Sequence, residues 1–147
     1  MNKRLILSAT SGKNLELANN LESVAKELGE EVEVINLENL KLPLYEPTRE
    51  KEGIPKMATE LAEKLSSSLV CIWCAPEYNG SIPPILSNAI AWVSRSSNDD
   101  NWRSSFQHKV AVVGTHSGGG GAKAVLAMRM QLEHLGSIVH PLSLIHI

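Results

Sequence analysis

The sequence predicts an α/β protein built on a parallel, doubly wound sheet. Strand-like and helix-like patterns alternate four times between Arg4 and Leu135, and a fifth apolar segment begins at Ile138. Residues 69–74 are apolar without alternation, which is typical of a parallel strand buried on both faces. Three of the predicted strand-to-helix loops are rich in Gly, Ser, Thr, Asn or Pro. In such sheets these loops open on one carboxyl edge, where ligands bind.

The chain has 147 residues, a length that suits one domain with one hydrophobic core. Its 14 basic and 16 acidic residues give a formal net charge of -2 without long runs of either sign, so neither nucleic acid nor a membrane is indicated as a partner. The apolar run at residues 5–7 ends at Ser8, far short of a signal peptide or a membrane span. We expect a single cytoplasmic domain, residues 1–147, that acts on small molecules and holds no metal.

The turn after the first predicted strand, residues 4–8, carries hydroxyl groups and precedes a helix. An apolar repeat that Gly29 ends indicates this helix: Leu17, Leu21, Val24 and Leu28. N–H groups at a helix start suit a phosphate, although an ordinary polar turn is the structural alternative. A nucleotide-hydrolase loop would need Gly at position 7 and Ser or Thr at position 14, where this chain has Leu7 and Asn14. The predicted phosphate contacts are Ser8, Thr10, Ser11, Gly12, Lys13 and Asn14.

Residues 31–36 alternate in polarity and predict a second strand nearer the sheet edge, followed by a proline-rich loop at residues 42–47. A helix then leads to the third strand, residues 69–74, and is indicated by Met57, Leu61 and Leu65. Within that strand, Cys71 and Cys74 point to opposite faces, because residues three apart on a strand do so. We therefore expect two buried core thiols and not a redox pair.

The loop at residues 75–84 joins the third strand to the next helix, and its composition predicts a wall against a flat polar ligand. Pro83 and Pro84 suit the helix start, and apolar residues then repeat on one face: Ile85, Leu86, Ala89, Ile90 and Val93. Glycine allows close approach, proline stiffens the loop, and Tyr, Asn and Ser supply hydrogen bonds. The predicted ligand contacts are Pro76, Glu77, Tyr78, Asn79, Gly80 and Ser81.

A polar insertion at residues 95–103 precedes the fourth strand, residues 109–114. Its Trp102 either packs the insertion down or borders an opening or a subunit interface. The next loop contains four consecutive glycines, which leave N–H groups free for a planar ligand, and a helix that Gly136 ends follows. Its predicted contacts are Thr115, His116, Ser117, Gly118, Gly119 and Gly120. His116 is also a candidate catalytic acid, but no partner at local spacing supports that role.

The segment Pro-Glu-Tyr-Asn-Gly-Ser-Ile-Pro at residues 76–83, with Asn-Ala-Ile-Ala-Trp at residues 88–92, resembles the NAD(P)H-dependent FMN reductase family. The resemblance extends from about Leu5 to Pro141. These flavodoxin-like proteins include quinone, azo-dye and chromate reductases. The resemblance implies a five-stranded sheet in the order 2-1-3-4-5, FMN as cofactor, and NADPH or NADH as electron donor.

The resemblance also implies roles for particular segments. The first loop binds the FMN phosphate, commonly with an Arg where this chain has Ala9 or Thr10, which leaves Lys13 to supply the charge. The glycine-rich loop contacts the pyrimidine side of the flavin ring. A homodimer or dimer of dimers is implied, with the Pro84 helix and the loop at residues 42–47 near the contact. Trp92 and Val93 on that helix exceed what one buried stripe needs and support this contact.

The leading hypothesis is an enzyme that passes electrons from a nicotinamide donor through FMN to a quinone, free flavin, azo dye or metal oxyanion. One alternative is a flavodoxin-like electron carrier, whose strongly acidic docking surface a net charge of -2 does not favour. A non-catalytic flavin-binding module is the other, and no residue excludes it. The sequence indicates neither the acceptor nor a preference between NADH and NADPH.

The end of the chain departs from the family pattern. Residues 138–141 resemble the family's fifth strand, but residues 142–147 do not continue into the helix that covers one flank of the sheet in family members. We therefore expect a missing C-terminal helix, through truncation or an unrelated tail, and an exposed flank that makes the chain marginally stable.

Overall fold

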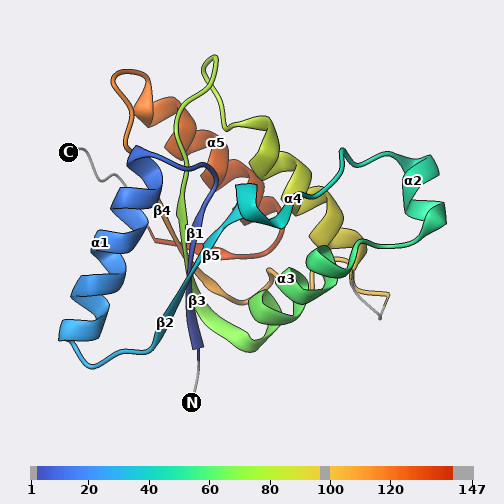
Figure 1. Ribbon diagram of the computed structural model, residues 1–147, viewed down its shortest axis with the longest axis horizontal. Helices are drawn as coiled ribbons and strands as arrows, with labels where there is room; N and C mark the ends of the chain where they lie inside the picture. The colour runs from blue at the N-terminus through green and yellow to red at the C-terminus, as the bar shows by residue number, and fades with distance from the viewer. Residues whose placement is uncertain (1–2, 97–99, 141–147) are drawn as a thin grey trace.

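A computed structural model describes residues 3–96 and 100–140. They form a five-stranded, all-parallel sheet in the order β2-β1-β3-β4-β5 (Figure 1). The strands are β1 (Lys3–Ser8), β2 (Val32–Asn36), β3 (Ser68–Cys74), β4 (Val110–Gly114) and β5 (Ile138–Val139). This arrangement confirms the predicted doubly wound α/β class and the strand order that the family resemblance implies.

Four long helices lie where the apolar repeats predict them. They are α1 (Lys13–Glu27), α3 (Lys56–Ser67), α4 (Pro84–Arg95) and α5 (Gly121–His134). Two short elements lie in the stretch that the sequence analysis treats as a loop: the 3-10 turn η1 (Leu37–Leu40) and α2 (Pro47–Glu52). With six residues and no buried side chain, α2 is too short and too exposed to show an apolar period.

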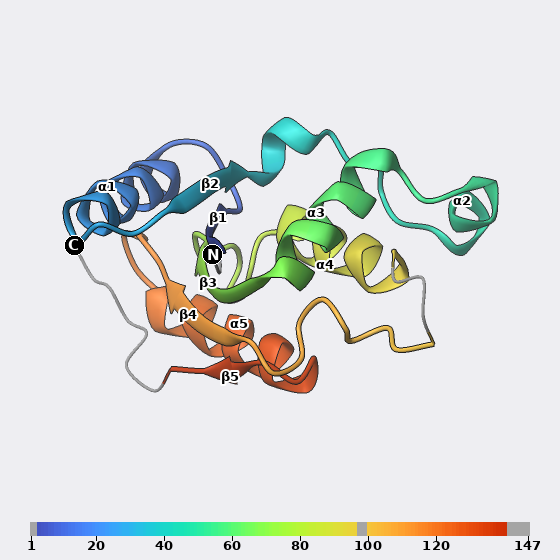
Figure 2. The ribbon, with the colours of Figure 1, turned by 90° about the horizontal axis from the view of Figure 1, so that it is seen from below.

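Helices cover both faces of the sheet, with α1 on one side and α3 and α4 on the other (Figure 2). The larger core lies between the sheet and α3, α4 and α5, and it includes Leu7, Trp73 and Val113. A smaller core lies under α1 and includes Ile6 and Leu17. None of the helices that the structure describes combines the length and apolar character needed to cross a bilayer.

The face under α1 is only partly covered by the described residues. α1 contacts β1, β2 and β3, and Ile72 on β3 packs at the margin of its core, whereas Val112 on β4 is half-buried outside that core. Further along the same face, Val110 is 38% exposed and Ile138 is 62% exposed. This part of the sheet therefore presents apolar surface that α1 does not reach. Residues 141–147, where the sequence analysis expects a covering helix to be missing, lie outside the described residues.

Cys71 and Cys74 are unpaired thiols buried on opposite faces of the sheet. Cys71 belongs to the larger core and Cys74 to the smaller one. Burial raises the pKa of Cys74 to about 12, and burial also raises the pKa of Cys71 well above its ordinary value. Their burial in different cores confirms the expectation of two core cysteines.

In the polar insertion before β4, the structure describes residues 95–96 and 100–103. Trp102 packs against His134, with ring centroids 5.9 Å apart, and the Arg103 guanidinium lies 4.7 Å from the centroid of the Trp102 ring. His134 ends α5, which runs from the carboxyl edge of the sheet to the amino edge. Trp102 therefore packs against α5 away from the carboxyl-edge loops, while 40% of its surface stays exposed.

Candidate functional site

The loops after β1, β3 and β4 lie together at the carboxyl edge of the sheet, at the top of Figure 1. Backbone pairing continues one residue beyond the strands. The N–H of Ala9 donates to the carbonyl of Cys74 at 2.8 Å, and the N–H of Ala75 donates to the carbonyl of Gly114 at 3.2 Å. These bonds hold the starts of the three loops at the spacing of neighbouring strands, about 4.8 Å.

The turn after β1 presents the start of α1 without a side-chain cap. Gly12 is the N-cap residue with a φ of 83°, and no side chain accepts a capping hydrogen bond there. A Cβ built on Gly12 would meet no atom within 4 Å, so the space in front of the helix is open. Free N–H groups and the positive end of the helix dipole make this position suitable for an anion.

Three of the predicted phosphate residues are exposed and three are buried. The exposed residues are Ser11, Gly12 and Lys13, and the buried ones are Ser8, Thr10 and Asn14. The Ser8 hydroxyl donates to the Thr10 carbonyl at 2.7 Å and so shapes the turn from within. The Lys13 ammonium pairs with Glu16 at 2.8 Å on an exposed surface, where an ion pair contributes little. Lys13 is therefore free to turn toward an anion at the helix start.

Two residues that the sequence analysis did not select, Asn36 and Glu38, reach this turn from the end of β2. Asn36 Nδ2 donates to Ser11 Oγ at 2.9 Å, and the Ser11 hydroxyl donates to the Glu38 carboxylate. The hydrogen bond from Ser11 lowers the pKa of Glu38, so this carboxylate is ionised at neutral pH. The available signal was the polar Asn36 at the end of the strand next to β1, whose following loop is less rich in Gly, Ser and Thr than the three predicted site loops.

The loop after β3 contains a tight turn in which the backbones of Tyr78 and Ser81 exchange hydrogen bonds of 2.9 and 3.0 Å. The central residues, Asn79 and Gly80, have φ values of 52° and 80°. Two consecutive positive φ values are typical of a type I′ turn, which favours Asn-Gly. The Glu77 carboxylate accepts a hydrogen bond from the N–H of Gly80. The exposed wall of this loop is therefore locally rigid.

The glycines of the loop after β4 have two different roles. Gly118 and Gly119 have no atom within 4 Å of the place that a Cβ would take, so they border open space. A Cβ on Gly120 would come within 3.1 Å of the Glu77 side chain. Gly118 and Gly119 thus leave room for a ligand, whereas Gly120 lets this loop pack against the loop after β3.

Asn14 joins the turn after β1 to the loop after β4. Its Nδ2 donates to the carbonyl oxygen of His116 at 3.0 Å, and its Oδ1 accepts from the N–H of His116 at 2.9 Å. Asn14 is 3% exposed, so both halves of its amide are engaged inside the protein. The bridge uses the backbone of His116 and leaves its imidazole out.

Thr115, at the base of the same loop, is 1% exposed. Its Oγ1 has no hydrogen-bond partner among the described residues. Thr115 is thus a buried hydroxyl at the base of the loop, with a hydrogen-bonding capacity that no described residue uses. Within residues 3–96 and 100–140, no group of His, Cys, Asp or Glu side chains is arranged to hold a metal ion.

A wide groove of about 690 Å³ adjoins the site between α4 and α5. It begins at Ser81 and Ile82, where the loop after β3 passes into α4, and it extends along α5 to Met130 and His134. Its lining carries no carboxylate, lysine or arginine side chain among the described residues. The groove is therefore a neutral, partly apolar extension of the carboxyl edge.

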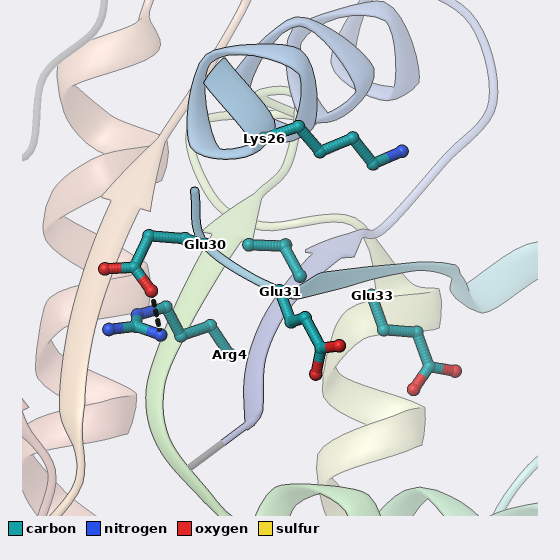
Figure 3. Close-up of a pocket in the computed structure, with 6 residues that line it drawn as sticks. Arg4, Lys26, Glu30, Glu31 and Glu33 are labelled. Atoms are coloured by element: carbon teal, nitrogen blue, oxygen red, sulfur yellow. Dashed lines mark ion pairs between the residues drawn. The ribbon is translucent and has the colours of Figure 1, made fainter. Parts of the chain in front are cut away.

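A separate hollow of about 340 Å³ lies beside the starts of β1 and β2 (Figure 3). Its lining mixes charges of both signs, and Arg4 is already paired with Glu30. This hollow is at the amino edge of the sheet, opposite the three loops. Since ligands of open parallel sheets bind at the carboxyl edge, the converging loops are the better candidate site.

Known proteins resemble this chain in sequence. Residues 3–145 match the model of the family described as NADPH-dependent FMN reductase. A quinone reductase of Escherichia coli is 33% identical over 101 residues, which cover 67% of this chain and 51% of that protein. An NAD(P)H-dependent FMN reductase of Pseudomonas aeruginosa is 32% identical over 104 residues, which cover 69% of this chain and 52% of that protein. The chain therefore spans about half the length of the curated relatives it matches.

Solved structures share the fold. FerB, a flavoenzyme NAD(P)H:(acceptor) oxidoreductase from Paracoccus denitrificans, has a TM-score of 0.79 at 23% identity, covering 97% of this chain and 76% of that chain. A flavodoxin from the domain Archaea has a TM-score of 0.69 at 13% identity, covering 99% of this chain and 82% of that chain. At these identities the likeness shows the fold alone, which is flavodoxin-like.

Proposed function

The chain belongs to the NADPH-dependent FMN reductase family, as its sequence motifs predict, and from this membership we propose that it is an FMN-dependent oxidoreductase. FMN supplies, when bound, the ability to take a hydride from NADPH or NADH and to give both electrons to an acceptor such as a quinone, free flavin, azo dye or metal oxyanion. The observation that carries the proposal is the convergence of the three loops at one edge of the sheet.

The residues present fit FMN in both its parts. The uncapped start of α1 suits the phosphate because it opens on unfilled space, and the exposed Lys13 ammonium can exchange its surface ion pair with Glu16 for a phosphate. The turn at Asn79 and Gly80 offers a rigid wall to one side of a flat ring. The backbone at Gly118 and Gly119 borders open space and can donate N–H groups.

The protein's own task in this proposal is to bind and orient. N–H groups at Gly118 and Gly119 are candidates to donate to a flavin ring and to stabilise negative charge on it. No side chain is required as a general acid or base, and the proposal gives the His116 imidazole no catalytic role. The neutral groove that begins at Ser81 supports a small-molecule acceptor, since it carries no charge of its own.

The test begins with purified protein. We expect it to be yellow, to release FMN on denaturation, and to bleach with NADPH in the absence of oxygen. NADPH oxidation that accelerates with added quinone supports an oxidoreductase over a flavin-binding module. Protein that binds FMN without oxidising NADPH would support the module, and protein that binds no FMN would contradict the cofactor as well.

We also propose that the chain forms a homodimer or a dimer of dimers, with α4 and the loop at residues 42–47 near the contact. Leu44 in that loop is 69% exposed, and Met57 at the start of α3 is 38% exposed, which supports an apolar contact on this side. Light scattering at micromolar concentration tests the assembly. A monomer under those conditions would contradict it.

A further inference from the structure

We propose that Asn14 is a positioning residue that fixes the glycine-rich loop, residues 115–121, against the start of α1. In this role it preassembles the phosphate and ring parts of one site. The inference rests on the proposed function, because it concerns the same FMN site. It differs from a ligand role for Asn14, since the side chain acts through His116 and does not touch the cofactor.

The geometry of the bridge is specific to an amide. Asn14 donates to the carbonyl oxygen of His116 and accepts from the N–H of the same residue, over 3.0 and 2.9 Å. The two residues are 102 positions apart, so the bonds join distant segments. Of the side chains of this size, Asn alone carries a donor nitrogen and an acceptor oxygen in the spacing of a peptide group. Asp retains only the acceptor, and Leu retains neither.

The glycine-rich loop needs such support because its middle is open. Gly118 and Gly119 have no neighbouring atoms within 4 Å of a Cβ position. The far end of the loop is held where Gly120 packs on Glu77, whose carboxylate also accepts from Gly80. The near end is held by the Asn14 bridge. Two fixed ends limit the conformational freedom that consecutive glycines would otherwise bring.

Asn14 also belongs to the anion end of the site. It is the second residue of α1, so its backbone N–H is among the first-turn donors that have no side-chain cap. Its side chain meanwhile holds the ring loop. One residue therefore links the two halves of the site, and a loop ordered before binding lowers the entropy cost of binding FMN.

Two substitutions and one control test this inference. Asn14→Leu keeps a similar volume without either hydrogen bond, and Asn14→Asp keeps the acceptor for the His116 N–H. Ser137→Ala is the control, because it removes a 2.9 Å hydrogen bond to the Phe106 carbonyl at the amino edge of the sheet. The measurements are amide exchange at His116 in FMN-free protein, melting temperature, FMN affinity, and the reduction potential of bound FMN.

We expect Asn14→Leu to accelerate exchange of the His116 amide and to weaken FMN binding by about tenfold or more, the factor equivalent to one lost hydrogen bond. The reduction potential of bound FMN should become more negative, because a displaced loop can no longer direct its N–H groups at the reduced ring. Asn14→Asp loses the donor to the His116 carbonyl and adds a negative charge at the anion end, so it should accelerate amide exchange less than Asn14→Leu and should also weaken FMN binding. Ser137→Ala should lower the melting temperature and leave FMN affinity and potential unchanged.

Three results would overturn the inference. A folded Asn14→Leu protein with wild-type FMN affinity and potential would show that the bridge does not position the loop for the cofactor. Equal losses of FMN affinity in Ser137→Ala and Asn14→Leu would show a general effect of stability. If Asn14→Leu does not fold, an Asn14→Asp protein with wild-type FMN affinity and potential decides against the inference. A wild-type protein that binds no FMN would instead overturn the proposed function itself.

Discussion

Trp92 donates a hydrogen bond from its indole Nε1 to the carbonyl oxygen of Pro43 over 2.7 Å. Asn88 Nδ2 donates to the same oxygen at 2.9 Å, and the ring of Tyr45 meets Trp92 edge-on with centroids 5.2 Å apart. Trp92 and Val93 are 0% and 1% exposed, so both are buried within one protomer. The sequence argument that these two side chains are surplus and point to a subunit contact is therefore wrong, because the proline-rich loop covers Trp92.

Replacing the indole should cost stability without changing assembly. Trp92→Phe keeps an aromatic ring but removes the donor and some volume, so we expect the free energy of unfolding to fall by about 1 to 3 kcal/mol. Urea unfolding of FMN-free protein measures this loss. Light scattering should give the same oligomeric state as the wild type, and a change of state would contradict burial within the protomer.

Neighbouring glycines should respond differently to alanine. Gly120→Ala introduces a Cβ about 3.1 Å from Glu77 at a φ of 69°, so it should lower stability by about 1 to 2 kcal/mol from backbone strain alone. Gly119→Ala meets no atom within 4 Å, and it should leave the melting temperature of FMN-free protein almost unchanged while weakening FMN binding. Thermal melts and FMN titrations check both. The reverse order of melting temperatures would rule out the two roles given to these glycines.

Lys13→Ala should distinguish the phosphate from the ring. A charge-assisted contact to phosphate contributes roughly 1.5 to 3 kcal/mol, so FMN affinity should fall while riboflavin affinity stays nearly constant. Lys26→Ala is the matched control, since Lys26 lies at the other end of α1 and pairs with Glu22 on the helix surface. Fluorescence titrations with both flavins measure the effect. Equal losses for FMN and riboflavin would show that Lys13 does not face the phosphate.

Glu38 should make a small contribution to the acid sensitivity of the fold. Hydrogen bonding from Ser11 lowers the pKa of Glu38 below its ordinary value, so the stabilisation from Glu38 is present above the unfolded-state pKa and is lost as pH falls through the folded-state pKa. Glu38→Gln should therefore flatten part of the fall in melting temperature below about pH 4.5. Melting curves of Glu38→Gln and of the surface control Glu63→Gln, compared between pH 3 and 6, check this expectation. An unchanged pH profile for Glu38→Gln would show that the Ser11 contact does not persist in solution.

The fold was predictable because its signals are local. A continuous apolar run marks β3, and apolar repeats near 3.6 residues mark the four long helices. Each pattern can be recognised within its own segment of the chain. The carboxyl-edge rule then brings the three loops together without any knowledge of side-chain contacts. α2 and η1 escaped prediction because elements of six and four residues carry no measurable period.

The partners of individual side chains were not predictable in the same way. Asn14 was selected as a ligand contact, yet its amide is engaged by His116, and Ser11 meets Glu38 from a loop that was not considered. Such pairings depend on the register between strands far apart in sequence, which residue type and spacing do not encode. The different roles of Gly119 and Gly120 could not be predicted for the same reason. Gly119 borders open space and Gly120 lies against Glu77, and the sequence does not encode these neighbours.

The labelling rates of the two buried cysteines can report how often each layer of this protein opens. These cysteines are its only thiols, and each lies in a different layer, Cys71 under α3 to α5 and Cys74 under α1. The thiolate is the group that attacks a thiol reagent, and a buried thiol stays protonated and out of reach, so labelling must wait until a layer opens. Single Cys71→Ser and Cys74→Ser variants each leave one thiol to be labelled. Its labelling rate reports how often that layer separates from the sheet. FMN bound across the loops should slow the labelling of both thiols, whereas loosening confined to α1 should speed the labelling of Cys74 alone.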